Sequence, residues 1–326
     1  MKEKLNIANF PTKIERLENF SKEVGKNVFL KRDDQTGSEF SGNKIRKLEY
    51  SIKEAIDQDC DTLITCGGIQ SNHARSTAAA GVKMGLKSVL VLRSDETPIL
   101  EGNYFIDKLI GADVRIISSS DYRDHRKEIM ENIQKELEKE GRKAYIVPEG
   151  ASNGIGVLGY YTGFDEILKQ EKSLGINFDT IVVAVGSGGT YAGLYLGNKI
   201  NNSKKDIVGV NVCDDADFFK NKSVEIINEC LPYIDNPKVE ITTKDMHIID
   251  GYVGIGYAKS RPEELDFIHK FAVANGVILD PVYTGKAMYG IYNEIKKGNL
   301  KDSKNILFIH TGGIFGLFPK SGEFQF

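Results

Sequence analysis

Lys44 is followed closely by two further cations, in the segment Ser41-Gly-Asn-Lys-Ile-Arg-Lys47. A helical pattern begins at Asn43, and the dipole at a helix N-terminus disfavours positive charge, so this placement suggests a functional reason. The charges of Arg46 and Lys47 are expected to lower the pKa of the Lys44 amine, which would suit it for imine formation with a carbonyl group. A nearby cation could instead bind phosphate, and a solvated basic helix start also explains the segment.

A glycine-rich turn follows a short apolar strand in the middle of the chain. Residues 181–185 predict a strand buried on both faces, and a helix is predicted from Thr190. Free N–H groups in such a turn, together with the helix dipole, favour an anion. The turn consists of Gly186, Ser187, Gly188, Gly189 and Thr190, and the small residues that allow the following helix to pack closely are Ala192, Gly193 and Gly197.

The same turn lacks the Gly-Lys-Ser/Thr of a nucleotide P-loop and the Gly-x-Gly-x-x-Gly spacing of a dinucleotide site. A single phosphate group therefore fits it better than a nucleotide does. An ordinary tight turn between strand and helix is the alternative explanation.

A second turn of this kind is Gly67-Gly-Ile-Gln-Ser-Asn72, which follows a predicted strand and precedes an alanine-rich helix. Ser71 or Asn72 could cap that helix, and both could donate hydrogen bonds to a carboxylate. His73 and Arg75 follow at once and are compatible with surface positions.

Two segments near the C-terminus carry hydroxyl groups at the ends of predicted elements. In Asp280-Pro-Val-Tyr-Thr-Gly-Lys286, Tyr283 could act as an acid or a base, and Thr284 could cap the next helix. Thr311 ends the last strand, where its hydroxyl could meet a ring nitrogen. A packed tyrosine and an ordinary strand-end turn are the simpler alternatives.

The composition excludes several classes of function. The 326 residues include 43 Lys and Arg against 46 Asp and Glu, a net charge of −3, which argues against nucleic acid or an anionic membrane as partner. No signal-like or membrane-spanning apolar run is present, and the four cysteines form no Cys-x-x-Cys pair, so neither a metal site nor a disulfide framework is expected. We expect a cytoplasmic protein.

Strand and helix patterns alternate along most of the chain, which predicts an α/β fold with parallel sheets flanked by helices. A helix is predicted over 14–24, and residues 241–257 are read as irregular. Two α/β lobes with a cleft between them are the natural architecture, because ligands bind beyond the carboxyl ends of parallel strands. A phosphate cradle, a polarised lysine, a carboxylate site and the lack of a metal motif together fit pyridoxal phosphate.

These motifs, in this order and over nearly the whole chain, resemble the D-cysteine desulfhydrase/1-aminocyclopropane-1-carboxylate (ACC) deaminase family. Its members are fold-type II pyridoxal-phosphate enzymes related to the tryptophan synthase β-subunit. The resemblance implies a two-lobed α/β fold with the cofactor in the cleft, and a homodimer. It also implies a large cofactor-binding domain at 1–46 and 155–326, with a small domain at 47–154 inserted in it.

The resemblance also implies a role for each matching residue. Lys44 would bind the cofactor as an imine, Ser71 would face the substrate's carboxylate and α-carbon, and Tyr283 would lie over the reacting carbons. Asn72 would bond to the ring hydroxyl of the cofactor, and Thr311 would lie near its pyridine nitrogen. The phosphate would be bound by Lys47, Ser187, Gly188, Gly189 and Thr190.

Two positions favour the desulfhydrase branch of that family. In this family, the ACC deaminases have a Tyr-Glu pair at the position that matches Tyr283-Thr284. They have an apolar residue at the position that matches Thr311. A hydroxyl cannot keep the pyridine nitrogen protonated as a carboxylate can, so the ring is a weaker electron sink, which suits β-elimination of a good leaving group. The resemblance thus implies a lyase that degrades D-cysteine, a small amino-acid substrate, to pyruvate, hydrogen sulfide and ammonia.

Other activities stay open at this point. A sibling lyase could act on L-cysteate, β-chloro-D-alanine or a serine derivative, and ACC deaminase is a further candidate, against which Thr284 counts. A non-catalytic binding protein would not need the imine lysine. The segment Ile249 to Ala258 has the family's glycine and tyrosine character, whereas Lys259-Ser-Arg-Pro262 departs from it.

Overall fold

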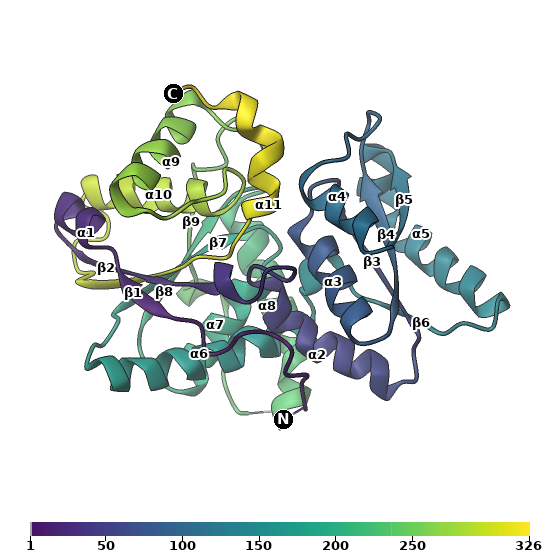
Figure 1. Ribbon diagram of the computed structural model, residues 1–326. Coiled ribbons are helices and arrows are strands. Elements are labelled where there is room, and N and C mark those ends of the chain that lie inside the picture. Colours follow the sequence, from purple (N-terminus) through teal and green to yellow (C-terminus); the bar gives the residue numbers. More distant parts are fainter. Residues whose placement is uncertain (1, 236) are drawn as a thin grey trace.

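The computed structural model describes residues 2–235 and 237–326 and contains two sheets, one in each lobe of the molecule (Figure 1). The larger sheet has six strands in the order β1-β2-β10-β7-β8-β9. All neighbours pair in parallel except β1, which runs antiparallel to β2. The strands are β1 (Ile14–Arg16), β2 (Asn27–Lys31), β7 (Thr180–Val185), β8 (Asp206–Asn211), β9 (His247–Ile249) and β10 (Asn305–Ile309).

The smaller sheet has four parallel strands in the order β5-β4-β3-β6. Together the two sheets confirm the predicted α/β class with mostly parallel sheets. The strands are β3 (Thr62–Gly68), β4 (Lys87–Arg93), β5 (Asp113–Ile117) and β6 (Ala144–Ile146).

Helices cover both faces of the larger sheet because its strands alternate apolar side chains between two cores. In β7, Ile181 and Val183 pack with residues of α6, α7 and α8, whereas Val182 and Ala184 pack with residues of α1, α9 and α10. The prediction of a strand buried on both faces is therefore confirmed. These helices are α1 (Glu18–Val24), α6 (Gly154–Leu174), α7 (Gly189–Ile200), α8 (Ala216–Cys230), α9 (Pro262–Asn275) and α10 (Thr284–Lys296).

The smaller sheet is covered in the same way, with α5 on one face and α2, α3 and α4 on the other. Its strands all lie between residues 62 and 146. The domain boundaries expected from the sequence, 1–46 with 155–326 and 47–154, stay a prediction. The helices are α2 (Lys44–Asp57), α3 (Asn72–Lys83), α4 (Gly102–Leu109), α5 (Ser119–Lys139) and, near the C-terminus, α11 (Ile314–Leu317).

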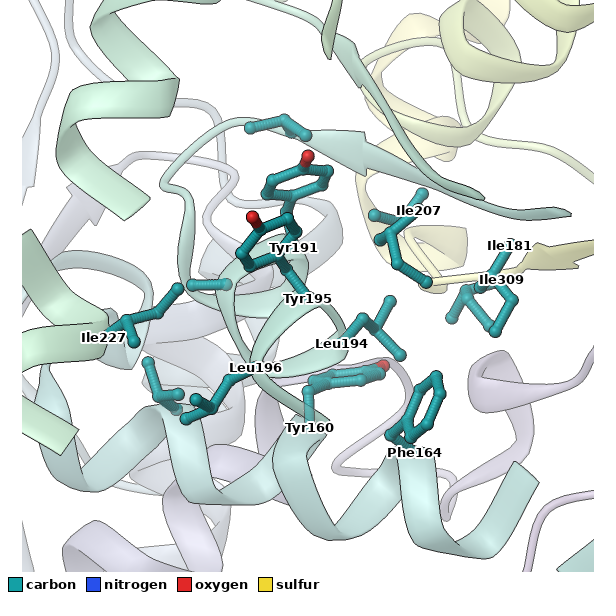
Figure 2. Packing of buried hydrophobic residues seen from close by; sticks show 14 of the residues in the cluster. Tyr160, Phe164, Ile181, Tyr191, Leu194, Tyr195, Leu196, Ile207, Ile227 and Ile309 are labelled. Carbon is teal, nitrogen blue, oxygen red and sulfur yellow. The ribbon is translucent and has the colours of Figure 1, made fainter. Parts of the chain in front are cut away.

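Small residues let α7 approach α6 closely, as the sequence predicts. A Cβ atom on Gly193 would lie 2.6 Å from the Cβ of Tyr160, and one on Gly197 would lie 2.6 Å from the Cβ of Phe164. Figure 2 shows these two rings on α6 beneath Leu194 of α7. The helix that begins at the glycine-rich turn is thereby fixed against the core.

Two sequence predictions of secondary structure are wrong. Residues Ile14–Arg16 form an edge strand paired with β2, so the helix predicted over 14–24 starts only at Glu18. Within the segment read as irregular, His247–Ile249 form a strand paired in parallel with β8. Both strands have three residues, too few to show a period of two. In the part of the chain that the structure describes, no helix combines the length and apolarity needed to cross a bilayer.

A buried ion cluster joins α2 to the larger sheet and to α6. Arg46 donates hydrogen bonds to Asp33 at 2.8 and 2.9 Å and to Glu166 at 2.9 and 3.0 Å. Lys31 donates to Glu166 at 2.6 Å, and the Tyr160 hydroxyl donates to Asp33. Burial alone would raise the pKa of Asp33, but the charge and hydrogen bonds of Arg46 hold that pKa well below its usual range.

We predict that Arg46→Met lowers the free energy of unfolding by about 3–5 kcal/mol, because it leaves two carboxylates near each other without their shared cation. Urea denaturation at neutral pH measures the loss. Arg16→Met is the matched control, since that guanidinium lies at the surface beside Glu18 and its removal should leave the urea midpoint nearly unchanged. Equal midpoints for the two variants would show that the cluster does not stabilise the fold.

Candidate active site

A cavity of about 1030 Å³ lies at the carboxyl ends of strands from both sheets. It brings together most of the residues that the sequence predicts for a site. Those that line it are Lys44, Ser71, Asn72, Ser187, Gly188, Thr190, Tyr283 and Thr311. Lys47 and Gly189 are buried and both contact Ser152, which itself lines the cavity.

Lys44 is the first residue of α2, and the loop before it is tied to the end of β10. The Asn43 N–H donates to the Thr311 carbonyl at 3.1 Å. Gly42 has φ +117°, and a Cβ there would lie 2.7 Å from the same carbonyl oxygen, so only glycine fits. The lysine and Thr311 are therefore held on one rigid unit.

The Lys44 amine has an altered pKa, but the cause differs from the one expected. Burial lowers the pKa of Lys44 to about 8, although the carboxylate of Glu149 acts in the opposite direction. Arg46 takes no part, because its guanidinium is bonded to Asp33 and Glu166 on the other side of α2. The sequence predicts that the pKa of Lys44 is lowered, but it does not show that burial of the amine is the cause.

A cradle of donors surrounds the start of α7. The Ser152 hydroxyl lies 3.4 Å from the Lys47 amine, 2.9 Å from the Ser187 hydroxyl and 3.2 Å from the Gly189 nitrogen. Gly188 has φ +82°, which turns the backbone into the helix. Lys47 is fully buried and forms no ion pair with a carboxylate of the described residues. Burial, and then the neighbouring charge of Lys44, lower the pKa of Lys47 well below its usual range.

Thr190 is also at the start of α7, but its hydroxyl already has a protein partner. The Asn43 side-chain amide donates to it at 2.9 Å, in a buried bond between the loop that leads to Lys44 (residues 36–43, the lysine loop) and the glycine-rich turn. This contact fixes the distance between Lys44 and the cradle. The sequence motif around Lys44 does not predict this role for Asn43.

The start of α3 forms a third part of the wall. The Ser71 hydroxyl accepts a hydrogen bond from the Ala74 N–H at 3.1 Å, so it is the N-cap of the helix. The side-chain oxygen of Asn72 (Oδ1) accepts a hydrogen bond from the side-chain amide of Asn103 at 3.0 Å. This leaves the side-chain NH₂ of Asn72 able to donate toward the cavity. Both side chains can therefore donate a hydrogen bond to an anion or to a hydroxyl oxygen in the cavity.

The interpretation of His73 and Arg75 as surface residues is wrong. His73 is 4% exposed, and its Nε2 pairs with the Thr65 hydroxyl at 2.8 Å. Arg75 is fully buried and donates to the carbonyls of Glu39 and Ser41, in the loop that leads to Lys44. Both side chains are polar and lie on the first turn of α3, so the hydrophobic periodicity of the sequence gives no sign that they are buried.

Tyr283 is the N-terminal flanking residue of α10, and its ring packs against Gly186, where an added Cβ would lie 3.0 Å away. Its hydroxyl is hydrogen-bonded to that of Tyr257. Burial, and then the proximity of Tyr257, raise the pKa of Tyr283 well above its usual range, so its hydroxyl stays protonated. It can therefore donate a proton or a hydrogen bond but exists very little as an anion.

Thr284 does not cap α10 as expected. The Asp280 carboxylate accepts from the N–H groups of Val282, Tyr283 and Thr284 at 2.8–3.0 Å, and the Thr284 hydroxyl donates to Asp280 at 2.7 Å. Thr284 is not among the residues that line the cavity, whereas Thr311 is.

The sequence analysis gives no role to many residues that line the cavity, among them Ser152, Tyr257 and Glu149. A signal for two of them was present, since Glu149-Gly-Ala-Ser-Asn-Gly154 is a polar, glycine-bearing turn between a strand and a helix. Tyr257 lies in a segment without periodicity, and its contact with Tyr283 depends on the tertiary fold alone.

The chain is similar to known proteins along most of its length. A family model described as "Pyridoxal-phosphate dependent enzyme" matches residues 5–312. The chain is 44% identical over 324 residues to the "Bifunctional D-cysteine desulfhydrase/1-aminocyclopropane-1-carboxylate deaminase, mitochondrial" of Arabidopsis thaliana, covering 97% of this chain and 79% of that one.

Solved structures give the same picture. A crystal structure described as an ACC deaminase homologue superimposes with a TM-score of 0.90 at 40% identity, covering 98% of this chain and 94% of that one. The processed form of threonine deaminase isoform 2 from Solanum lycopersicum matches with a TM-score of 0.64 at 19% identity, covering 98% and 85% of the two chains. The second likeness shows the fold alone.

The residues of the cavity fit pyridoxal phosphate. The group carries a phosphate dianion, an aldehyde and a pyridine ring. Burial lowers the pKa of Lys47, whose amine lacks an anionic partner among the described residues, and the phosphate would supply the opposite charge that favours the protonated amine. Lys44 offers an amine whose pKa of about 8 increases the unprotonated fraction that can attack the aldehyde, and Thr311 offers a hydroxyl that could meet the ring nitrogen.

We predict that covalent attachment of pyridoxal phosphate to the apoprotein becomes faster with rising pH, with a midpoint near pH 8. The pKa of Lys44 is about 8, below the ordinary lysine value of about 10.4, and the unprotonated form that attacks the aldehyde predominates above it. Stopped-flow absorbance from about pH 6 to about pH 10 measures the rate. Lys44→Ala should show no attachment, and a midpoint at about 10 would disprove the effect of burial.

Proposed function

This chain belongs to the pyridoxal-phosphate dependent enzyme family, and from that premise we propose that it is a lyase that degrades D-cysteine. The overall reaction converts D-cysteine and water to pyruvate, hydrogen sulfide and ammonia. The name of the Arabidopsis relative, which includes D-cysteine desulfhydrase, supports this substrate. The specific observation that carries the choice is the hydroxyl of Thr311 at the predicted ring-nitrogen position.

The acidic residues of the cavity support elimination over opening of a cyclopropane ring. Among the described residues, those acids are Glu131, Glu149 and Asp214, and none belongs to the segment 280–312. Bound pyridoxal phosphate supplies an electron sink for the pair left when the α-proton departs. With a hydroxyl instead of a carboxylate at its nitrogen that sink is weaker, which suffices where a thiolate leaves.

We assign proton transfer at the α-carbon to Lys44. Lys44 would hold the cofactor before the substrate binds, and its free amine, with a pKa of about 8, would have an unprotonated fraction able to accept the proton near neutral pH. The start of α3 would bind the α-carboxylate, through the hydroxyl of Ser71 and the helix dipole. This contact would orient the α-hydrogen toward the amine.

Tyr283 would protonate the departing sulfur. Its hydroxyl lies in the cavity and remains protonated because burial raises its pKa. Donation to the sulfur would let it leave as neutral hydrogen sulfide instead of as an anion. Tyr257, bonded to the same hydroxyl, keeps it oriented.

ACC deamination is a second candidate, because the Arabidopsis relative is named as bifunctional. The cavity is large enough for other small β-substituted amino acids, so L-cysteate, β-chloro-D-alanine and serine derivatives remain alternatives. Lys44 in the cavity argues against a pure binding protein. We further propose a homodimer that acts in the cytoplasm, although the Arabidopsis relative is named as mitochondrial.

We predict that the purified holoenzyme releases sulfide from D-cysteine and not from L-cysteine. Lys44→Ala should abolish both sulfide release and the visible absorbance of the lysine-bound cofactor, because no other amine occupies that position. Lys53→Ala on the same helix is the control, since its amine pairs with Asp57 at the surface. Visible absorbance without sulfide from either isomer would reject the substrate, and L-cysteate and ACC would be tested next.

Tyr283→Phe is predicted to lower kcat for sulfide release by roughly 10²- to 10⁴-fold, the usual range for loss of a general acid. Cofactor absorbance should stay at the wild-type level, because the hydroxyl is not needed to hold it. Tyr289→Phe, on the same helix and outside the cavity, should keep wild-type kcat. An unchanged kcat in Tyr283→Phe would remove this tyrosine from the mechanism.

A further inference from the structure

One wall of the cavity is made by a loop without regular structure, residues 250–261, which we name the tyrosine loop. It connects β9 to α9 and contains glycines at positive φ, among them Gly254 and Gly256. The tyrosine that it places at the cavity is Tyr257, whose hydroxyl meets that of Tyr283. Inside this loop the Gly256 N–H donates to the Val253 carbonyl at 3.4 Å and the Lys259 N–H donates to the Gly256 carbonyl at 3.2 Å, and neither long bond involves the backbone of Tyr257.

Lys286 holds this loop from below. Its amine donates to the Val253 carbonyl at 2.5 Å and to the Gly256 carbonyl at 2.9 Å. The side chain has no exposed surface, and no carboxylate of the described residues lies within ion-pair distance of its amine. Burying an ammonium group is costly, and here two carbonyl oxygens of a single loop supply the compensating hydrogen bonds.

Further contacts fasten the two ends of the tyrosine loop. The Tyr252 hydroxyl donates to Glu294 of α10 at 2.5 Å, and the Arg261 N–H donates to Glu264 of α9 at 2.8 Å. Between these ends, the amine of Lys286 binds the carbonyl next to Tyr257 in the chain. Lys286 is thus the side chain best placed to determine the position of Tyr257 at the cavity.

The same helix therefore controls both tyrosines. Tyr283 is at the N-terminus of α10, and Lys286 is three residues further on, so their spacing is fixed by helix geometry. On the far side, the guanidinium of Arg93 on β4 lies 5.4 Å from the Tyr257 ring centre, so the ring also contacts the smaller sheet's lobe. A shift of the loop would move Tyr257 away from both neighbours.

We propose that Lys286 is a positioning residue, which places the Tyr257 hydroxyl against Tyr283 by binding the carbonyls of Val253 and Gly256. This inference rests on the proposed role of Tyr283 in proton donation. No contact of Lys286 with the cavity is required, because it acts through the loop. Its amine is an unusual choice for a buried position, and an apolar side chain would leave both carbonyls without this donor.

The test compares Lys286→Met with Lys296→Met in the holoenzyme. Lys296 is on the exposed end of the same helix, where its amine binds the Tyr292 hydroxyl. For Lys286→Met we expect kcat for sulfide release to fall by roughly 10- to 100-fold, with KM within about twofold. Cofactor absorbance should be unchanged, which separates this result from a failure at Lys44. Lys296→Met should match the wild type.

Hydrogen exchange gives a readout that does not depend on the substrate. The amides of Gly256 and Lys259, which donate to the Val253 and Gly256 carbonyls at 3.4 and 3.2 Å, should exchange roughly 10- to 100-fold faster in Lys286→Met, and those of the lysine loop should not change. Wild-type exchange in a folded Lys286→Met protein would overturn the proposal, whatever the substrate proves to be. If that variant does not fold, Lys286→Gln, whose shorter side chain keeps a donor but cannot reach both carbonyls, replaces it in each measurement.

A double-mutant cycle with Tyr257→Phe decides whether Lys286 acts through that hydroxyl. If it does, the Lys286 substitution should lower kcat by less than about threefold in the Tyr257→Phe background, because the hydroxyl it positions is already gone. An undiminished loss in that background would show that Lys286 acts elsewhere, and the proposal would fail. Lys296→Met in the same background should again have no effect.

Discussion

Two lysine amines buried one helical turn apart at the floor of the cleft impose the constraint on which the site depends. Lys44 and Lys47 both have lowered pKa values because of burial, and Lys47 has no carboxylate partner among the described residues. An unpaired buried cation is costly unless the structure holds it rigidly or a ligand supplies the opposite charge. The cradle of Ser152, Ser187 and the α7 N-terminus is where that ligand's phosphate would bind.

The surrounding fold explains how two such amines can be kept in place. Arg46, between them in sequence, faces the opposite way and is fixed by Asp33 and Glu166, so α2 cannot rotate to expose its lysines. Gly159 of α6 lets the two helices touch, because a Cβ there would lie 2.4 Å from the Arg46 carbonyl oxygen. The ion cluster therefore stabilises the fold and also holds the site in its geometry.

The sequence predicts the strand–turn–helix units well because each one is local. The turn at Gly186–Thr190 and the helix start at Lys44 need only neighbouring residues to be recognised. Edge strands of three residues, such as His247–Ile249, carry too little pattern to be recognised. Ser152 and Tyr257 contact site residues that are 37 and 26 positions away in the chain, at Gly189 and Tyr283. Burial itself, which sets the pKa of Lys44, is a property of the assembled cavity and no motif encodes it.

One physical effect gives the two proposed proton-transfer groups opposite roles. Burial disfavours the charged form of any side chain, so it lowers the pKa of an amine and raises that of a phenol. In this cavity the pKa of Lys44 falls to about 8, and that of Tyr283 rises well above its usual range. An unprotonated fraction of the amine can then accept a proton near neutral pH, whereas the phenol keeps its proton and can share it in a hydrogen bond or give it to a strongly basic group. Greater exposure to water would bring both pKa values back toward those of the free side chains. The contacts that hold the tyrosine loop against the cavity therefore also maintain this division of roles.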